Sequence, residues 1–270
     1  MTEHDVIVTG ASRGIGRALA RALAAKGRRL VLVARDAAAL ETLAREVEAR
    51  GAAAAVVPGD LGSLARARAL GDRLATIARP GAALVHNAGL WPSERVITDG
   101  GLEAAFVVNH LGGLALQAPL LDARRLGRIM VVSAGLILKG RFDPQRTPTG
   151  ADFSRLRTYC TTKLCFAIAM RDVAAAHPEV DVVVLHPGVV NTGLGAQRGP
   201  IGVLLSLVKR AWESPDVCAE RLARIFARER WSTAGEAKWL VEEAEQPWPE
   251  IADDPSTRDA VRRATARWLS

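Results

Sequence analysis

The only tyrosine of the chain, Tyr159, is followed four residues later by Lys163. Residues four apart on a helix share one face, so the phenol and the ammonium group can meet at one site. A free phenol has a pKa of about 10, and a neighbouring cation in a desolvated site favours the phenolate. The spacing therefore predicts an acid–base pair in which Lys163 lowers the pKa of Tyr159. The alternative is an ordinary pair on a helix surface.

A glycine-rich segment, residues 9–16 with the sequence TGASRGIG, is a second candidate site. Gly10 would allow a tight turn, Gly14 would let the backbone approach a pyrophosphate, and Gly16 would let a helix pack closely on a sheet. The N-terminus of the following helix would supply free N–H groups and a positive dipole end. A plain strand-to-helix turn is the alternative, but the apolar run before the segment and the amphipathic run after it favour dinucleotide binding.

Short apolar runs rich in Val, Ile and Leu alternate along the chain with amphipathic runs. Strands are predicted at residues 6–9, 30–34, 53–57, 83–86, 129–133, 180–186 and 238–241. Helices are predicted at residues 14–26, 36–50, 64–78, 102–121, 154–176 and 215–228. Continuous apolar strands separated by helices are typical of a parallel sheet covered on both faces. We therefore expect an α/β fold of the Rossmann type, with a doubly wound parallel sheet of about seven strands in a single domain, residues 1–270.

With glycines at the first turn and Tyr-x-x-x-Lys far downstream, the chain resembles the short-chain dehydrogenase/reductase family over nearly all of its length. The resemblance implies a hydride-transferring enzyme with four catalytic residues. Ser133, at the end of a predicted strand, would help to hold the substrate oxygen. Asn109 would anchor a water-mediated proton path to Lys163, and Tyr159 would be the general acid or base.

The same resemblance implies a binding site for a nicotinamide cofactor. The element His86-Asn-Ala-Gly89 would stabilise the sheet and line the cofactor, with His86 as a structural departure from the commoner Asn. Asp60 and Leu61 would contact the adenine ring, and residues 187–192 would fix the nicotinamide face. The implied set is Gly10, Ser12, Arg13, Gly14, Ile15, Gly16, Arg35, Asp60, Leu61, Asn87, Ala88, Gly89, Tyr159, Lys163, Pro187, Gly188, Val190 and Thr192. No metal site is predicted.

Residues after the second predicted strand indicate the choice of cofactor. An acidic side chain there would bind the ribose diol of NAD, whereas an arginine accommodates the 2′-phosphate of NADP. Position 34 is alanine, Arg35 follows it, and Arg13 is a second cation near the same place. Asp36 is the rival ribose ligand, but its position before a helical run predicts a helix N-cap. We expect NADP(H).

Finer resemblances point to one branch of the family. Residues 109–113, the 26-residue separation of Ser133 and Tyr159, and residues 186–192 resemble the branch of retinol dehydrogenases, their WW-domain relatives and protochlorophyllide reductases. That branch commonly has a bulkier residue at the position of Gly113. Cys165 is similar to a cysteine of protochlorophyllide reductases, although a small buried hydrophobic role is favoured.

Residues 191–213, with several glycines, are predicted to form a substrate lid. Their apolar run predicts a lipophilic substrate; contact with a membrane surface is the alternative. The predicted reaction interconverts a lipophilic or aromatic carbonyl and its alcohol. A non-catalytic NADP-binding sensor or regulator on the same fold is the rival function.

The net charge and the number of cysteines indicate which classes of partner and which compartment to expect. The net charge is +7, but the basic residues are scattered among acidic neighbours, so we expect no nucleic acid partner. Three cysteines predict no disulfide framework and a reducing, cytoplasmic location. We expect neither a secretion signal nor a transmembrane segment. The family resemblance leaves a homo-oligomer or a monomer open.

Overall fold

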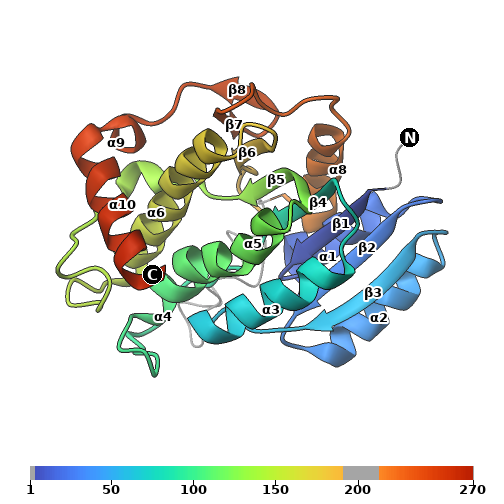
Figure 1. Ribbon diagram of the computed structural model, residues 1–270, viewed down its shortest axis with the longest axis horizontal. Coiled ribbons are helices and arrows are strands. Elements are labelled where there is room, and N and C mark those ends of the chain that lie inside the picture. The colour runs from blue at the N-terminus through green and yellow to red at the C-terminus, as the bar shows by residue number, and fades with distance from the viewer. Residues whose placement is uncertain (1–3, 191–212, 270) are drawn as a thin grey trace.

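An eight-stranded sheet runs through the protein, with helices on both of its faces (Figure 1). The computed structural model describes residues 4–190 and 213–269. The strands are β1 (Asp5–Thr9), β2 (Arg29–Ala34), β3 (Ala53–Pro58), β4 (Ala82–His86), β5 (Leu126–Val132), β6 (Asp181–His186), β7 (Ala237–Val241) and β8 (Ala244–Gln246). Their order is β3-β2-β1-β4-β5-β6-β7-β8, and neighbours are parallel except for β7 and β8. The predicted doubly wound parallel sheet is confirmed, with β8 added at one edge.

Alternate residues of the central strands face opposite sides of the sheet. In β1, Val6 and Val8 belong to one buried apolar cluster and Ile7 belongs to the other. Helices α1 (Gly14–Leu23), α2 (Ala37–Glu48) and α8 (Pro215–Phe226) contribute to the first cluster, and α3 (Leu64–Ile77), α5 (Gly112–Asp122) and α6 (Arg155–Ala176) contribute to the second. Because both faces are buried, the strands are apolar at nearly every position.

The predicted helix at residues 102–121 is divided into three parts. Helices α4 (Ala104–Phe106) and α5 flank η1 (Val107–Leu111), a wider turn with π-helical hydrogen bonds. Wide turns of this kind are frequent at functional sites. Asn109 lies in the middle of this one.

The segment Ala104–Asp122 is long and apolar enough to cross a membrane, judged by length and composition alone. In the fold, however, 83% of the apolar stretch is buried inside the protein. A helix that is hydrophobic on all sides is typical of such a buried position. A buried core helix meets the same criteria of length and composition, and we interpret this segment as one.

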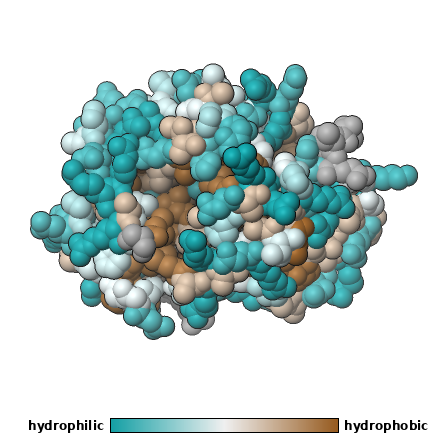
Figure 2. Space-filling view, in the orientation of Figure 1, coloured by the Kyte–Doolittle hydropathy of each residue, from teal (hydrophilic) through white to brown (hydrophobic). Residues whose placement is uncertain are grey.

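Two helices at the C-terminal end, α9 (Glu250–Asp253) and α10 (Pro255–Leu269), were not predicted. Arg262 of α10 donates two hydrogen bonds to Asp172 of α6, at 3.3 and 3.0 Å. Apolar residues of α5, α6 and α10 enclose a groove of about 340 Å³, which appears as the brown hollow in Figure 2. The helix pattern of α10 is weak because, of its residues, only Val261 and Ala264 are buried.

Helix ends follow local capping interactions. Asp36 caps α2 as predicted, because its carboxylate accepts a hydrogen bond of 3.0 Å from the N–H of Ala39. Helix α1 ends at Leu23 rather than at Lys26, since Ala24 already has an extended backbone with φ −67° and ψ 112°.

Candidate active site

The glycine-rich segment forms the turn between β1 and α1. Gly10 and Gly14 have φ values of +66° and +56°, in the left-handed region that favours glycine. A Cβ at Gly16 would clash with the carbonyl oxygen of Gly10 and the side-chain amide of Asn87. The N-terminus of α1 has no side-chain cap, because Arg13 makes no such hydrogen bond. This helix end is therefore open to a negatively charged ligand.

Asn87 ties the glycine turn to the end of β4. Its Nδ2 donates to the carbonyl oxygens of Thr9, at 3.0 Å, and Gly10, at 3.2 Å. The hydroxyl oxygen of Thr9 accepts hydrogen bonds from the N–H groups of Asn87, at 3.0 Å, and Ala88, at 3.1 Å. The Asn87 side chain is thus engaged with the backbone and shapes the turn in which a cofactor would lie.

Two exposed arginines follow neighbouring strands, Arg13 after β1 and Arg35 after β2. Arg13 belongs to the glycine turn, and Arg35 directly follows β2, which pairs with β1. Within residues 4–190 and 213–269, neither guanidinium group forms an ion pair with another residue. Ser12 and Ile15 are half-buried in the same turn. Two uncommitted cations beside a helix N-terminus suit a ligand that carries several phosphate groups.

Asp60 and Leu61 follow β3 at the same edge of the sheet. The carboxylate of Asp60 accepts a hydrogen bond of 3.0 Å from Gly62 and lies 3.3 Å from the guanidinium group of Arg66. Leu61 is 8% exposed and belongs to the apolar cluster on the side of α3 and α5. Both residues stabilise the loop, and their contact with an adenine ring stays a prediction.

Asn109 connects the loop after β4 to helix α6. Its Oδ1 accepts a hydrogen bond from the N–H of Leu90 at 2.8 Å, and its Nδ2 donates to the carbonyl oxygen of Leu90 at 2.9 Å. The same Nδ2 donates to the hydroxyl group of Thr162 at 3.0 Å. The amide of Asn109 therefore fixes the loop against the helix that carries Tyr159 and Lys163.

The ammonium group of Lys163 is buried beside the end of β5. Its Nζ donates to the carbonyl oxygen of Val132 at 3.0 Å. A Cβ at Gly89 would lie 3.3 Å from Lys163 Nζ and 3.3 Å from Asn109 Oδ1, so these two side chains approach the same place. Burial lowers the pKa of Lys163 to about 8, because desolvation disfavours the charged form.

Tyr159 lies one turn before Lys163 on α6 and is 6% exposed. Burial, with a smaller contribution from the Cys160 thiol, raises the pKa of Tyr159 to about 12. The predicted lowering of this pKa by Lys163 is therefore wrong for the chain by itself. The ammonium group is bonded to Val132, whereas the ring of Trp91 covers the phenol, so desolvation dominates.

Ser133 directly follows β5 and is 5% exposed. Its N–H donates to the carbonyl oxygen of Leu185 at 2.8 Å, which holds the backbone in place. Its buried hydroxyl oxygen has no hydrogen-bond partner within the part of the chain that the structure describes. Buried polar atoms without partners are rare in folded proteins, and a ligand oxygen would satisfy this one.

The predicted nicotinamide segment follows β6. Pro187 is buried and Gly188 has φ +92°. Val190 pairs with Glu213 in an isolated bridge. Thr192 and the predicted lid, residues 191–213, lie outside the described residues except for Glu213, so their assignment stays a prediction.

Comparison with known proteins assigns the family. The sequence model of the family described as short chain dehydrogenase matches residues 4–200, more than half of the chain. The chain belongs to the short-chain dehydrogenase family.

Curated relatives place this dehydrogenase near the retinol dehydrogenase branch. It is 35% identical to a protein of Streptomyces sp. (strain C5) named as a daunorubicin C-13 ketoreductase, DnrU, over 73% of this chain and 69% of that protein. It is 32% identical to mouse retinol dehydrogenase 14, over 72% of this chain and 64% of that protein. The match thus spans less than two thirds of the mouse protein. The chain is also 29% identical to human retinol dehydrogenase 13, over 97% of this chain and 73% of that protein.

Solved structures support the fold. An alcohol dehydrogenase from the archaeon Thermococcus sibiricus, complexed with 5-hydroxy-NADP, has a TM-score of 0.65 and 25% identity, covering 92% of this chain and all of that one. A 3-oxoacyl (acyl-carrier-protein) reductase from Agrobacterium tumefaciens C58, with NADP bound, has a TM-score of 0.69 and 23% identity, covering 89% and 94%.

Packing explains the residues at two positions, Gly113 and Cys165, that bear on the branch of the family. A Cβ at Gly113 would lie 2.8 Å from the ring of Phe166, so this aromatic side chain fills the space that a bulkier residue would need. Cys165 is fully buried in the apolar cluster, as predicted for a small hydrophobic side chain.

Sequence analysis did not identify two residues of the candidate site, Thr162 and Trp91. Thr162 accepts the hydrogen bond from Asn109 and lies next to Lys163, but a hydroxyl inside a buried helix gives little signal. Trp91 stacks on Tyr159, and an aromatic residue directly after the Asn-Ala-Gly-Leu run is the signal that could have revealed it.

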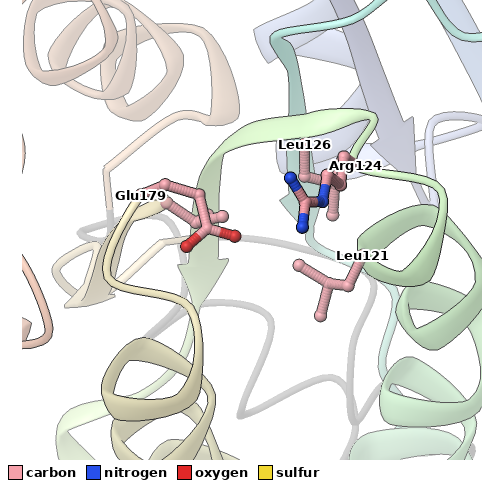
Figure 3. Close-up of a pocket in the computed structure, with 5 residues that line it drawn as sticks. Leu121, Arg124, Leu126 and Glu179 are labelled. Atoms are coloured by element: carbon pink, nitrogen blue, oxygen red, sulfur yellow. The ribbon is translucent and has the colours of Figure 1, made fainter.

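A cavity of about 290 Å³ lies at the amino ends of strands β5 and β6 (Figure 3). Leu126 begins β5, and Val180 directly precedes β6. Arg124 and Glu179 stand on its two sides. Ligands of open α/β sheets bind at the carboxyl ends of the strands, so this cavity is separate from the candidate active site.

Proposed function

We propose that the protein is an NADP(H)-dependent oxidoreductase that interconverts a lipophilic or aromatic carbonyl compound and its alcohol, with Tyr159 as general acid and base. One observation carries the proposal: the buried Lys163 and the Ser133 hydroxyl, which has no hydrogen-bond partner among the described residues, lie at the end of the same strand, β5. Both stand at the carboxyl edge, on which α/β sheets bind their ligands.

The residues of the glycine turn suit the pyrophosphate of a dinucleotide. The uncapped N-terminus of α1 offers N–H groups, and Gly10 lets the turn pack against Ala88 and Asn87, with which a Cβ at this position would collide. Arg13 and Arg35 would hold the 2′-phosphate that distinguishes NADP from NAD. When bound, the reduced nicotinamide supplies a hydride to the carbonyl carbon. Solved relatives with NADP or 5-hydroxy-NADP support this choice.

Tyr159 and Ser133 would act on the substrate oxygen. The phenol is protonated at neutral pH, so Tyr159 can donate its proton to the oxygen of a carbonyl during reduction. The hydroxyl group of Ser133 would donate a hydrogen bond to the same oxygen. Lys163 and Asn109 hold the loop and the helix around this point.

The proposed substrate class rests on chemistry and on relatives. Trp91 places an aromatic surface beside the phenol, and apolar rings stack favourably on such a surface. The curated relatives named as a ketoreductase and as retinol dehydrogenases also support a lipophilic carbonyl or alcohol.

Turnover of NADPH with a panel of aldehydes, ketones, quinones and retinoids tests the function. Tyr159→Phe should reduce kcat on the order of a thousandfold, because the proton donor is lost. NADPH binding, followed by nucleotide fluorescence, should be unchanged.

Leu156→Ala, on an exposed position of the same helix, is the matched control and should keep full activity. If the wild-type protein binds NADPH but reduces no compound of the panel, a non-catalytic sensor replaces the proposed enzyme.

A further inference from the structure

Trp91 lies directly against the ring of Tyr159. The two ring centroids are 4.3 Å apart and the planes differ by 26°, which is a stacked arrangement. Trp91 is half-buried, whereas Tyr159 is 6% exposed. One face of the phenol is therefore covered by the indole and shielded from water.

The indole is held in place at both ends of its loop. Both backbone groups of Leu90 are hydrogen-bonded to Asn109, at 2.8 and 2.9 Å. The carbonyl oxygen of Ser93 accepts a hydrogen bond of 2.6 Å from Arg155, the first residue of α6. Pro92 restricts the backbone of Trp91 to extended conformations. The loop that carries Trp91 is thus bonded to η1, which contains Asn109, and to α6, which carries Tyr159.

We propose that Trp91 is a positioning residue for Tyr159: its indole fixes the orientation of the phenol ring and excludes water from one face of it. The proposal rests on the proposed function, in which Tyr159 is the general acid. It adds that the phenol ring is already oriented by the indole before a ligand binds.

The surroundings of the phenol support this role. Ionisation would leave a phenolate beneath an apolar ring, where water cannot solvate it. Lys163, the nearby cation on the same helix, donates to the carbonyl oxygen of Val132. Burial raises the pKa of Tyr159, and the Cys160 thiol of the same helix adds a smaller contribution in the same direction.

The proton transfer balances in the direction of reduction. The O–H bond of Tyr159 breaks and a new O–H bond forms on the substrate oxygen, while the reduced nicotinamide gives its hydride to the carbonyl carbon. The nicotinamide is oxidised and the carbonyl is reduced to an alcohol. The phenolate then regains a proton from solvent.

The single tyrosine of the chain makes the experiment selective, because any tyrosinate absorbance comes from Tyr159. Tyrosinate formation is read after a rapid pH jump, before alkaline unfolding, in the wild-type protein and in Trp91→Leu. The apparent pKa of Tyr159 should fall by about one unit in the variant, a tenfold change in the phenolate equilibrium. Trp91→Phe keeps an aromatic ring and should stay close to wild type.

Trp248→Leu is the matched control, since Trp248 packs against Trp239 and Arg171 and has no contact with Tyr159 in the described structure. Circular dichroism confirms folding of each variant. In parallel, kcat/KM for carbonyl reduction should fall about tenfold in Trp91→Leu, because the phenol ring is no longer held in one orientation, and recover in Trp91→Phe.

The outcomes separate the two proposals. An unchanged tyrosinate titration in Trp91→Leu overturns the role of Trp91, even if the enzyme reduces carbonyl compounds. A shifted titration in a protein that reduces none of the panel supports the contact and overturns the proposed function. A lower kcat/KM that Trp91→Phe does not restore also overturns the positioning role.

Discussion

The start of β1 and the end of β5 differ in how their buried charged groups are paired. At the amino edge, Asp5 and Arg29 begin β1 and β2 in register and form an ion pair of 3.0 Å. The same carboxylate accepts a hydrogen bond of 2.9 Å from the N–H of Arg79. At the carboxyl edge, Lys163 is buried without a carboxylate partner in the described ranges, and the Ser133 hydroxyl has no partner there either.

In this parallel sheet, the groups that stabilise the fold lie at the amino ends of the strands, and the groups available to ligands lie at the carboxyl ends. Paired charges at the amino edge stabilise the start of the sheet. The Lys163 ammonium, which has no carboxylate partner among the described residues, and the Ser133 hydroxyl, which has no hydrogen-bond partner there, destabilise the free protein and are available to ligands, which is a common cost of an active site. Substitutions at the two edges should therefore affect different quantities.

The largest effect on stability is expected at the amino edge. Asp5→Ala should lower the free energy of unfolding by about 3–5 kcal/mol, because the partly buried Arg29 loses the carboxylate that compensates it. Urea unfolding measures this change. Asp72→Ala, at an exposed position, is the control. A large loss of NADPH affinity in Asp5→Ala at a temperature where it is folded would contradict the separation of the edges.

At the carboxyl ends of the strands, the buried charge of Lys163 should lower the stability of the free protein rather than raise it. Burial lowers its pKa in the folded protein to about 8 from the ordinary value of 10.5, so between these values the unfolded chain binds more protons. The contribution of Lys163 to stability therefore rises from about pH 8 to pH 10.5, by roughly 3 kcal/mol.

Lys163→Met should remove this pH-dependent rise and stabilise the free protein at neutral pH, while turnover is lost. Urea unfolding across this pH range compares the variant with wild type and with Lys26→Met, at an exposed position. Equal pH dependence in all three proteins would show that the Lys163 ammonium is not destabilised by burial.

A smaller effect is expected for a substitution of Arg35, which should change the affinity for the cofactor and leave the stability of the fold unchanged. Arg35→Ala should weaken NADPH binding by roughly 2 kcal/mol, about thirtyfold, because a charge-assisted hydrogen bond to the 2′-phosphate is lost. Binding of NADH should stay the same. Isothermal titration calorimetry measures both affinities, with Arg68→Ala as an exposed control. A strong preference of the wild-type protein for NADH would overturn the assignment.

The smallest effect is expected for Asp36, and it distinguishes a helix N-cap from a ligand of the cofactor ribose. Asp36→Ala should lower the free energy of unfolding by about 1 kcal/mol, because the N–H of Ala39 loses its acceptor. Asp36→Asn keeps an acceptor and should be close to wild type. The ratio of NADPH to NADH affinity should not change in either variant, and a changed ratio would restore Asp36 as the ribose ligand.

Much of the fold was predictable because parallel strands buried on both faces are continuous apolar runs. All seven predicted strands are present within a few residues of their expected bounds. Strand β8 was missed since its three residues are exposed and it forms only by pairing with β7. The division at η1 was missed because a π-helical turn has no distinct pattern of apolar residues.

Of the candidate site, the sequence by itself determined what depends on local geometry. Tyr159 and Lys163 share a helix face because they are four residues apart, and Asp36 caps α2 because its side chain reaches a neighbouring N–H. Only the tertiary structure decided the environment of the phenol. Trp91 reaches Tyr159 from 68 residues away, and Lys163 bonds to Val132 on a different element. The direction of a pKa shift follows from such distant neighbours and from the water they exclude, and residue spacing contains neither.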